Sequence, residues 1–102
     1  MTTAQRPAAD PAAVAHLTAK AQVYYVPRSL VPGLVGYAVD RCPVGSFLTA
    51  VLENNLVEAV LRADNVNRLK LREIVGFISD ELPSACWGSP TKVDAWLTGK
   101  GA

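Results

Sequence analysis

The stretch from Gly45 to Asn67, GSFLTAVLENNLVEAVLRADNVN, most constrains what this chain can fold into. Leucine, valine and alanine recur through it at helical spacing, which predicts two short amphipathic helices and the entrance to a third. Polar residues interrupt the apolar pattern twice, at Asn54–Asn55 and again from Asp64. Asn and Asp at such interruptions are typical of helix starts, because their side chains accept hydrogen bonds from unpaired backbone amides. The stretch therefore indicates an α-helical fold but no particular chemistry.

The remainder of the chain continues the helical pattern. Asp10 followed by Pro11 predicts a helix start, since the carboxylate caps the first turn and proline fits there without losing a hydrogen bond. The same order of cap and proline returns at Ser89–Pro90. No stretch alternates apolar and polar residues for long enough to predict a sheet. We therefore predict an all-α fold: a single compact domain of five to six short helices with a disordered N-terminal tail.

The chain is expected to divide into three segments. Residues 1–9 are small and polar, and they form the predicted disordered tail. Residues 10–22 form an N-terminal helix with a thin apolar side, so we expect a docked arm of a kind that can also pack on a neighbouring subunit. Residues 23–102 form the helical domain, in which the longest helix is expected from about Asn65 to Leu82. Apolar residues at helical spacing are expected to form the buried face of that helix: Leu71, Ile74, Val75, Ile78 and Leu82. In the short helix before it, the same spacing puts three apolar residues on one buried side: Leu56, Val60 and Ala63.

Four polar residues are expected to cap the internal helices: Ser29, Ser46, Asn55 and Asp64. Asn55 and Glu58 have the spacing of a capping box, in which the glutamate reaches back to the backbone amide of the cap residue. These residues are accounted for by helix capping alone.

The composition argues against several function classes. Ten Lys and Arg against nine Asp and Glu leave a net charge of +1, so the chain as a whole does not favour nucleic acid or an anionic membrane. No apolar run reaches the roughly 18 residues needed to span a bilayer, and the N-terminus lacks the order of a signal peptide. We therefore expect a cytoplasmic protein that does not bind membranes.

The sequence contains no recognisable metal or catalytic constellation. Cys42 and Cys86 lie far apart, and neither has a second Cys or a His at metal-ligand spacing, so we expect free, partly buried thiols. The serines lack a neighbouring base. Asp80 and Glu81 are adjacent on a predicted helix and are expected to point apart. We expect no enzymatic activity, no metal and no cofactor.

Residues that capping does not require define the candidate site. Asn54 and Asn67 are such residues, and with Arg68 they mark the junction between the short helices and the long one. Arg72 follows Arg68 by four residues and is predicted to share its helix face. Trp87 precedes a helix start and predicts either a stacking platform or a plug over the core. These five residues are the candidates for ligand or partner binding.

Several stretches resemble a group of small α-helical proteins found in tailed bacteriophages, prophages and bacterial genomes. The stretches are Pro27, Gly33–Tyr37, the run GSFLTAVLENNL, Ala63–Asp64 with Asn67, the run CWGSP, and Ala95–Trp96. The resemblance extends from Tyr25 to Leu97. It implies association with a phage or mobile element, in the host cytoplasm if the chain is phage-encoded, and it implies no activity.

Three hypotheses about function result. The first is a small non-catalytic phage or prophage accessory protein that acts by protein–protein binding, with a homodimer as one form, and that inhibits a host defence system. The second is an oligomeric protein that sequesters a small nucleotide at Asn54, Asn67 and Arg68. The third is weak nucleic-acid binding through four basic residues: Arg62, Arg68, Lys70 and Arg72. This hypothesis is the least favoured, because nearby acidic residues offset their charge.

Geometry separates the first two hypotheses. Convergence of Asn54, Asn67, Arg68 and Trp87 on one concave surface favours the nucleotide. If these residues scatter and an apolar patch of several hundred Å² is exposed, a protein partner is favoured.

Overall fold

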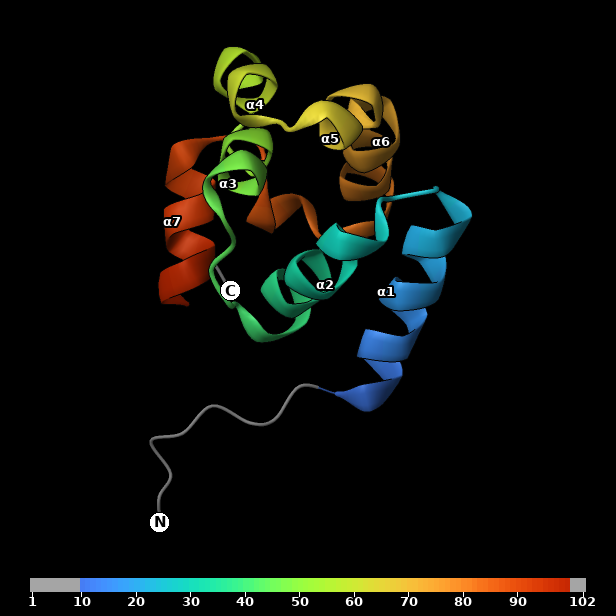
Figure 1. The fold of residues 1–102 in the computed structure, drawn as a ribbon. Coiled ribbons are helices and arrows are strands. Elements are labelled where there is room, and N and C mark those ends of the chain that lie inside the picture. The colour runs from blue at the N-terminus through green and yellow to red at the C-terminus, as the bar shows by residue number, and fades with distance from the viewer. Residues whose placement is uncertain (1–9, 100–102) are drawn as a thin grey trace.

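The structure, a computed structural model, describes residues 10–99 as helices joined by short loops (Figure 1). The elements in chain order are α1 (Pro11–Val23), η1 (Arg28–Leu30), α2 (Val31–Asp40), α3 (Ser46–Leu52), α4 (Leu56–Arg62), α5 (Asn65–Leu69), α6 (Leu71–Glu81), η2 (Ser84–Cys86) and α7 (Pro90–Thr98). No strand occurs between residues 10 and 99, which confirms the all-α fold class. The tail predicted for residues 1–9 lies outside the described residues, and the division into arm and domain stays a prediction.

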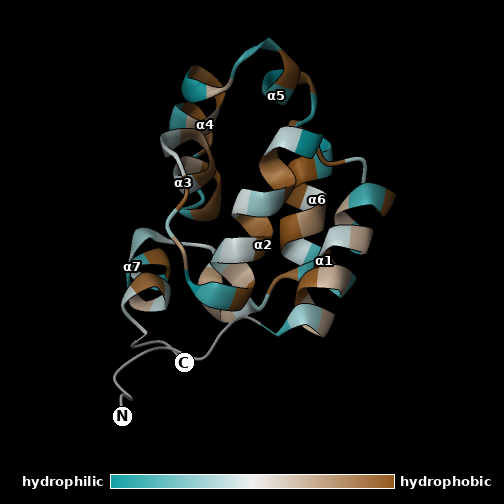
Figure 2. Ribbon diagram, turned by 60° about the horizontal axis from the view of Figure 1, so that its bottom comes forward, coloured by the Kyte–Doolittle hydropathy of each residue, from teal (hydrophilic) through white to brown (hydrophobic). Residues whose placement is uncertain are grey.

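One hydrophobic core joins α1, α2, α3, α6, α7 and η2. The largest side chains with essentially no exposed surface are Leu34, Tyr37, Leu52, Ile74, Phe77 and Cys86. Both ribbon views place α2 between α1 and α7 (Figures 1 and 2). α1 packs against α2 and α6, whereas α3 packs against α4 and α7. The helices therefore share one core, as the sequence predicts.

Buried hydrogen bonds tie α2 to the C-terminal part of the chain. The hydroxyl of Tyr37 donates to the backbone oxygen of Cys86, and the indole Nε1 of Trp96 donates to the backbone oxygen of Tyr37, each at 2.7 Å. Arg41 donates from Nη1 to the backbone oxygen of Trp96 at 2.9 Å, and its guanidinium carbon lies 3.8 Å from the centroid of the Trp96 ring. Burial raises the pKa of Tyr37 above its ordinary value. This part of the core thus combines apolar packing with directional contacts.

The α1 helix is fixed by contacts around Tyr24. The Tyr24 ring packs edge-on against Phe77 with centroids 5.9 Å apart. Its hydroxyl lies 2.9 Å from Asp80 Oδ2 and 3.1 Å from Glu81 Oε2, so the prediction that these carboxylates point apart is wrong. The phenol extends to the last turn of α6, where one hydroxyl lies within reach of both side chains. The hydrogen bond to Asp80 is the main cause that raises the pKa of Tyr24 to about 12.

The predicted helix caps are partly confirmed. Four side chains accept a hydrogen bond from a first-turn amide: Asp10, Asn55, Asp64 and Ser89. The predictions for Ser29 and Ser46 are wrong, because Ser29 lies inside the η1 turn and Ser46 is already the first residue of α3. Leu30 and Gly45 occupy the cap positions instead, without a side-chain hydrogen bond. The preceding turn, rather than the presence of a serine, decides where these two helices begin.

The helix predicted from Asn65 to Leu82 is divided at Lys70. The Lys70 backbone has φ −112° and ψ 14°, and its amide donates to the oxygen of Asn67, three residues back, at 3.1 Å. The α-helical hydrogen-bond pattern resumes at Ile74, whose amide donates to the Lys70 oxygen, four residues back, at 2.9 Å. This division contributes to a count of seven α-helices in residues 10–99, against the predicted five to six.

Candidate functional site

The junction between α3 and α4 gives Asn54 a backbone role. Asn54 has φ 63°, in the left-handed region. Its amide donates to the oxygen of Val51 at 3.0 Å, and the amide of Asn55 donates to the oxygen of Ala50 at 2.9 Å. This pair of hydrogen bonds is the Schellman motif that ends a helix, and asparagine is among the non-glycine residues best suited to the left-handed position. Asn54 is therefore explained by helix termination.

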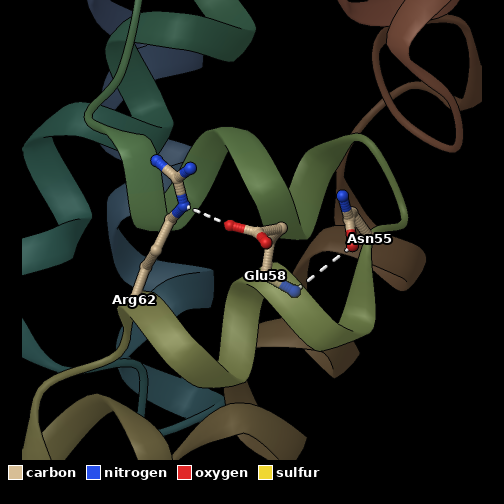
Figure 3. Close-up of polar contacts among 3 residues, drawn as sticks. All are labelled: Asn55, Glu58 and Arg62. Carbon is tan, nitrogen blue, oxygen red and sulfur yellow. Dashed lines mark hydrogen bonds and ion pairs between the residues drawn. The ribbon is translucent and has the colours of Figure 1, made fainter.

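The predicted capping box at the start of α4 is only half formed (Figure 3). Asn55 Oδ1 accepts from the Glu58 amide at 3.2 Å. The carboxylate of Glu58 does not reach back, because the Asn55 amide is already used by the Schellman motif. Glu58 Oε1 instead accepts from Arg62 Nε at 2.8 Å, four residues along the same helix. Arg62 is thereby paired on its own helix.

A hollow of about 220 Å³ lies between α4 and α6. We call it the α4–α6 groove, and it is lined by Val51, Asn54, Asn55, Leu56, Ala59, Leu71, Val75, Ile78 and Trp87. The loop that carries Trp87 is held against α3 by a 2.7 Å hydrogen bond from the Gly88 amide to the Leu52 oxygen. The Trp87 Nε1 atom is buried and has no hydrogen-bond partner within residues 10–99. The groove is thus apolar, with amides from two asparagines at its edge.

Asn67 lies away from this groove. Its side chain is buried, with 9% exposed, and it lines a separate hollow beside Phe47 and Leu48. Its backbone amide donates to Asp64 Oδ1 at 2.7 Å. Asn67 is the residue that α5 turns towards the core.

The five candidate residues do not converge on one site. Asn54 and Trp87 line the α4–α6 groove, whereas Asn67 lines another hollow. Arg68 and Arg72 are exposed, and the break at Lys70 places them on different helices. The prediction that these arginines share one face of a continuous helix is therefore wrong.

A set of large apolar side chains is exposed on α4, α5 and the adjoining side of α6. The exposed fractions are 70% for Leu56, 67% for Val57, 71% for Leu61, 60% for Val66, 83% for Leu69 and 47% for Val75. With roughly 60–120 Å² for a fully exposed aliphatic side chain, this set exposes on the order of 250–500 Å². The sequence pattern predicted Leu56 and Val75 on buried faces, which is wrong. The α4 helix packs mainly on α3, so the side of α4 that faces α6 is not covered by a close helix contact.

The α5 helix and the end of α1 form an exposed surface that shares Val66 and Leu69 with this apolar set. We call it the α5 surface and define it by Tyr25, Val66, Arg68, Leu69 and Lys70. Tyr25 is 73% exposed and has φ 62° in a Schellman motif that ends α1. The Nζ of Lys70 lies 5.9 Å from the centroid of the Tyr25 ring, which joins the end of α1 to α5.

Neither cysteine forms a disulfide. The Sγ of half-buried Cys42 lies 3.6 Å from Asp40 Oδ2. Cys86 is fully buried, and burial raises the pKa of its thiol to about 11. Among residues 10–99, no cluster of three or more His, Cys, Asp or Glu side chains could hold a metal ion. The same part of the chain contains no helix with the length and apolar character to cross a membrane.

Comparison with known proteins found no family model, curated protein or solved structure that matches this chain. The geometry itself defines an all-α protein with an apolar groove and an exposed, mixed apolar and basic surface.

Proposed function

We propose that this protein is a small non-catalytic phage or prophage accessory protein that acts by binding another protein through the α5 surface. The inverted polarity of α5 is the observation that supports this function. Leu69 is 83% exposed and Val66 60% exposed, whereas Asn67 is buried. A helix that only supports a core turns its apolar residues inwards. The outward apolar pair is therefore better explained by a contact that a partner covers.

The composition around that pair also fits a protein contact. Tyr25 and Arg68 are exposed beside α5, and Tyr and Arg are the residue types most enriched among side chains that dominate binding energy. Lys70 adds a second cation. We expect a partner that places an apolar side chain against Leu69 and a carboxylate near Arg68.

The scattered positions of the candidate residues support protein binding over the two other hypotheses. A nucleotide held by Asn54, Asn67 and Arg68 would need these residues on one concave surface. Asn54 and Asn67 line separate hollows, and Arg68 is exposed and lines neither of them. Nucleic-acid binding would need a shared basic face. Arg62 is paired with Glu58, and the break at Lys70 separates the next two arginines.

The biological role that we attach to this binding is inhibition of a host defence system in the host cytoplasm. The resemblance to proteins of tailed phages and prophages supports the phage association that this role requires, and it implies no activity of its own. A non-catalytic inhibitor needs only a stable scaffold and one surface that blocks a target. The α5 surface on an all-α scaffold meets both requirements.

The test is capture of a partner from host lysate, followed by measurement of affinity with the purified partner. Leu69→Asp should weaken binding at least 10-fold, which corresponds to about 1.4 kcal/mol. Leu61→Asp is the matched control, because Leu61 has a similar exposed fraction, 71%, but lies on α4. Equal binding by wild type and Leu69→Asp would refute the assignment to the α5 surface.

A further inference from the structure

An open hollow between the end of α1, the start of α2 and Lys70 is lined by cations without acids. Its volume is about 680 Å³, and Arg28 and Lys70 both line it, whereas no Asp or Glu does. We call it the basic hollow. Within residues 10–99, no carboxylate oxygen lies within 4 Å of either cation. Glu73, the acidic residue nearest to Lys70 along the chain, does not line it. The described chain therefore leaves these two charges without an ion pair.

Two backbone turns bring the cations to the basic hollow. At the end of α1, the Val26 amide donates to the Ala21 oxygen at 3.0 Å, and the chain then passes from buried Val26 to Arg28 at the start of η1. The break between α5 and α6 leaves Lys70 half-buried, with its Nζ 5.9 Å from the centroid of the Tyr25 ring. Both cations thus stand at turns that the packing of the helices holds in place.

The other walls of the basic hollow are of two kinds. Val26 and Val31 are buried and supply apolar surface. Thr18 and Gln22 on α1 supply a hydroxyl and a side-chain amide. A carboxylate is held by cations and hydrogen-bond donors, whereas the methylene groups that carry it pack on apolar surface. The hollow offers both kinds of contact to an Asp or Glu side chain.

Lys70 shows most clearly what an incoming carboxylate would change. The ammonium group has one polar or ring contact within residues 10–99, the distant approach to the Tyr25 ring. A half-buried charge without an ion pair is poorly compensated for the water that it has lost. An opposite charge interacts with it more strongly there than on the open surface, because the surroundings are less polar than water.

The surroundings of the basic hollow favour an acidic protein segment over a nucleic acid. Tyr25 and Lys70 belong both to the hollow and to the α5 surface, which also carries exposed Val66 and Leu69. A nucleic acid has a charge at every nucleotide and stacks its bases on successive aromatic rings. The hollow has two cations and one ring. A protein segment can combine carboxylates with aliphatic side chains, and this combination matches the hollow and the surface beside it.

We propose that the basic hollow is a binding site for an acidic side chain of a protein partner, whose carboxylate lies in the hollow that Arg28 and Lys70 line. The proposal rests on the proposed function in that the same partner covers the α5 surface. It adds the chemistry of the partner: the segment that contacts this chain is acidic. The charge of the hollow then makes association faster and more selective, and salt weakens it.

The experiment is titration of the full chain with three ten-residue peptides, followed through its amide signals in nuclear magnetic resonance spectra. The first peptide has seven glutamates and three leucines, the second has serines in place of the leucines, and the third has lysines in place of the glutamates. The first two should bind below 5 mM, the first more tightly, and the third should not bind. The amides of Gln22, Arg28 and Lys70 should shift, whereas those of α4 should not.

Charge reversal tests the role of the two cations. Arg28→Glu and Lys70→Glu should each weaken binding of both acidic peptides by about 5-fold or more, because repulsion replaces attraction. Arg62→Glu is the matched control, since it makes the same change in net charge on α4, and it should weaken binding less than about 2-fold. Binding by the wild type should also fall as salt rises from 20 to 200 mM. Thermal unfolding of each variant checks that the fold is kept.

Three results overturn this proposal. One is the absence of shifts around the basic hollow at 5 mM of either acidic peptide. Another is an equal loss of binding for Arg28→Glu and Arg62→Glu, which would show that net charge, and not the hollow, attracts the peptide. The third is tighter binding of a ten-nucleotide thymidine oligonucleotide than of the first peptide, which would assign the hollow to nucleic acid.

The basic hollow and the α5 surface fail separately. Leu69→Asp should remove the advantage of the leucine peptide over the serine peptide, while the preference for acidic peptides at the hollow persists. Acidic peptides that bind at the hollow with no advantage from leucine support the hollow and contradict the α5 surface. An advantage from leucine that survives both Arg28→Glu and Lys70→Glu, with no loss of overall binding, supports the α5 surface and contradicts the hollow.

Discussion

Tyr37→Phe removes one hydroxyl from the centre of the core and should destabilise the protein by about 1–3 kcal/mol. The hydroxyl donates to the Cys86 backbone oxygen at 2.7 Å, and the Tyr37 side chain has no exposed surface. The variant leaves that carbonyl without this donor in a site that water does not reach. For a domain of this size, 1 kcal/mol corresponds to about 4–8 °C in Tm, so Tm should fall by at least about 4 °C.

Calorimetry or thermal circular dichroism gives the measurement, and Tyr24→Phe is the matched control. Tyr24 loses the same atom, but its hydroxyl lies near the surface between Asp80 and Glu81, where water can replace it. The loss there should be less than about 1 kcal/mol. A Tm for Tyr37→Phe within 2 °C of wild type, or a larger loss for Tyr24→Phe, would show that the link from α2 to η2 does not stabilise the fold as described.

Three further predictions concern backbone and thiols. Asn54→Ala should cost about 1 kcal/mol because Asn54 has φ 63°, whereas Asn54→Gly should stay within about 0.5 kcal/mol of wild type; chemical denaturation compares them. Stability should fall as pH rises from about 9 towards 11, because burial raises the pKa of Cys86 from 9.0 to about 11 and the unfolded chain loses this proton first. Cys86→Ala should flatten that part of the pH profile. A maleimide at pH 8 should modify half-buried Cys42 first, and Cys86 at the same rate as Cys42 would contradict its burial.

Local chemistry explains what the sequence predicted well. Asp10, Asn55 and Asp64 cap helices because their side-chain oxygens reach amides two or three residues away, and no distant contact is involved. The helix break at Lys70 has no such local signal, since neither glycine nor proline stands there. Periodicity predicted the burial of Ile74 and Ile78 on α6 but wrongly included Val75. Its division from α5 was not.

The candidate site was less predictable because exposure depends on which helices pack together. Leu56 and Val75 fit a buried pattern in the sequence, yet they are 70% and 47% exposed. Asn67 stood out as a residue not needed for capping, but its burial beneath α5 could only be seen in three dimensions. Asn54 stood out for the same reason, and the structure assigns it to a left-handed helix end.

The left-handed backbone of Tyr25 sets fold stability against partner binding at a single residue. A residue with a Cβ in the left-handed conformation costs about 1–2 kcal/mol, which glycine avoids, so Tyr25→Gly should stabilise the fold. The same change removes an aromatic ring from the α5 surface. Natural sequences keep such costs where another requirement opposes them. Evolution of this chain for heat resistance alone should therefore replace Tyr25 early, whereas evolution with partner binding also required should retain it.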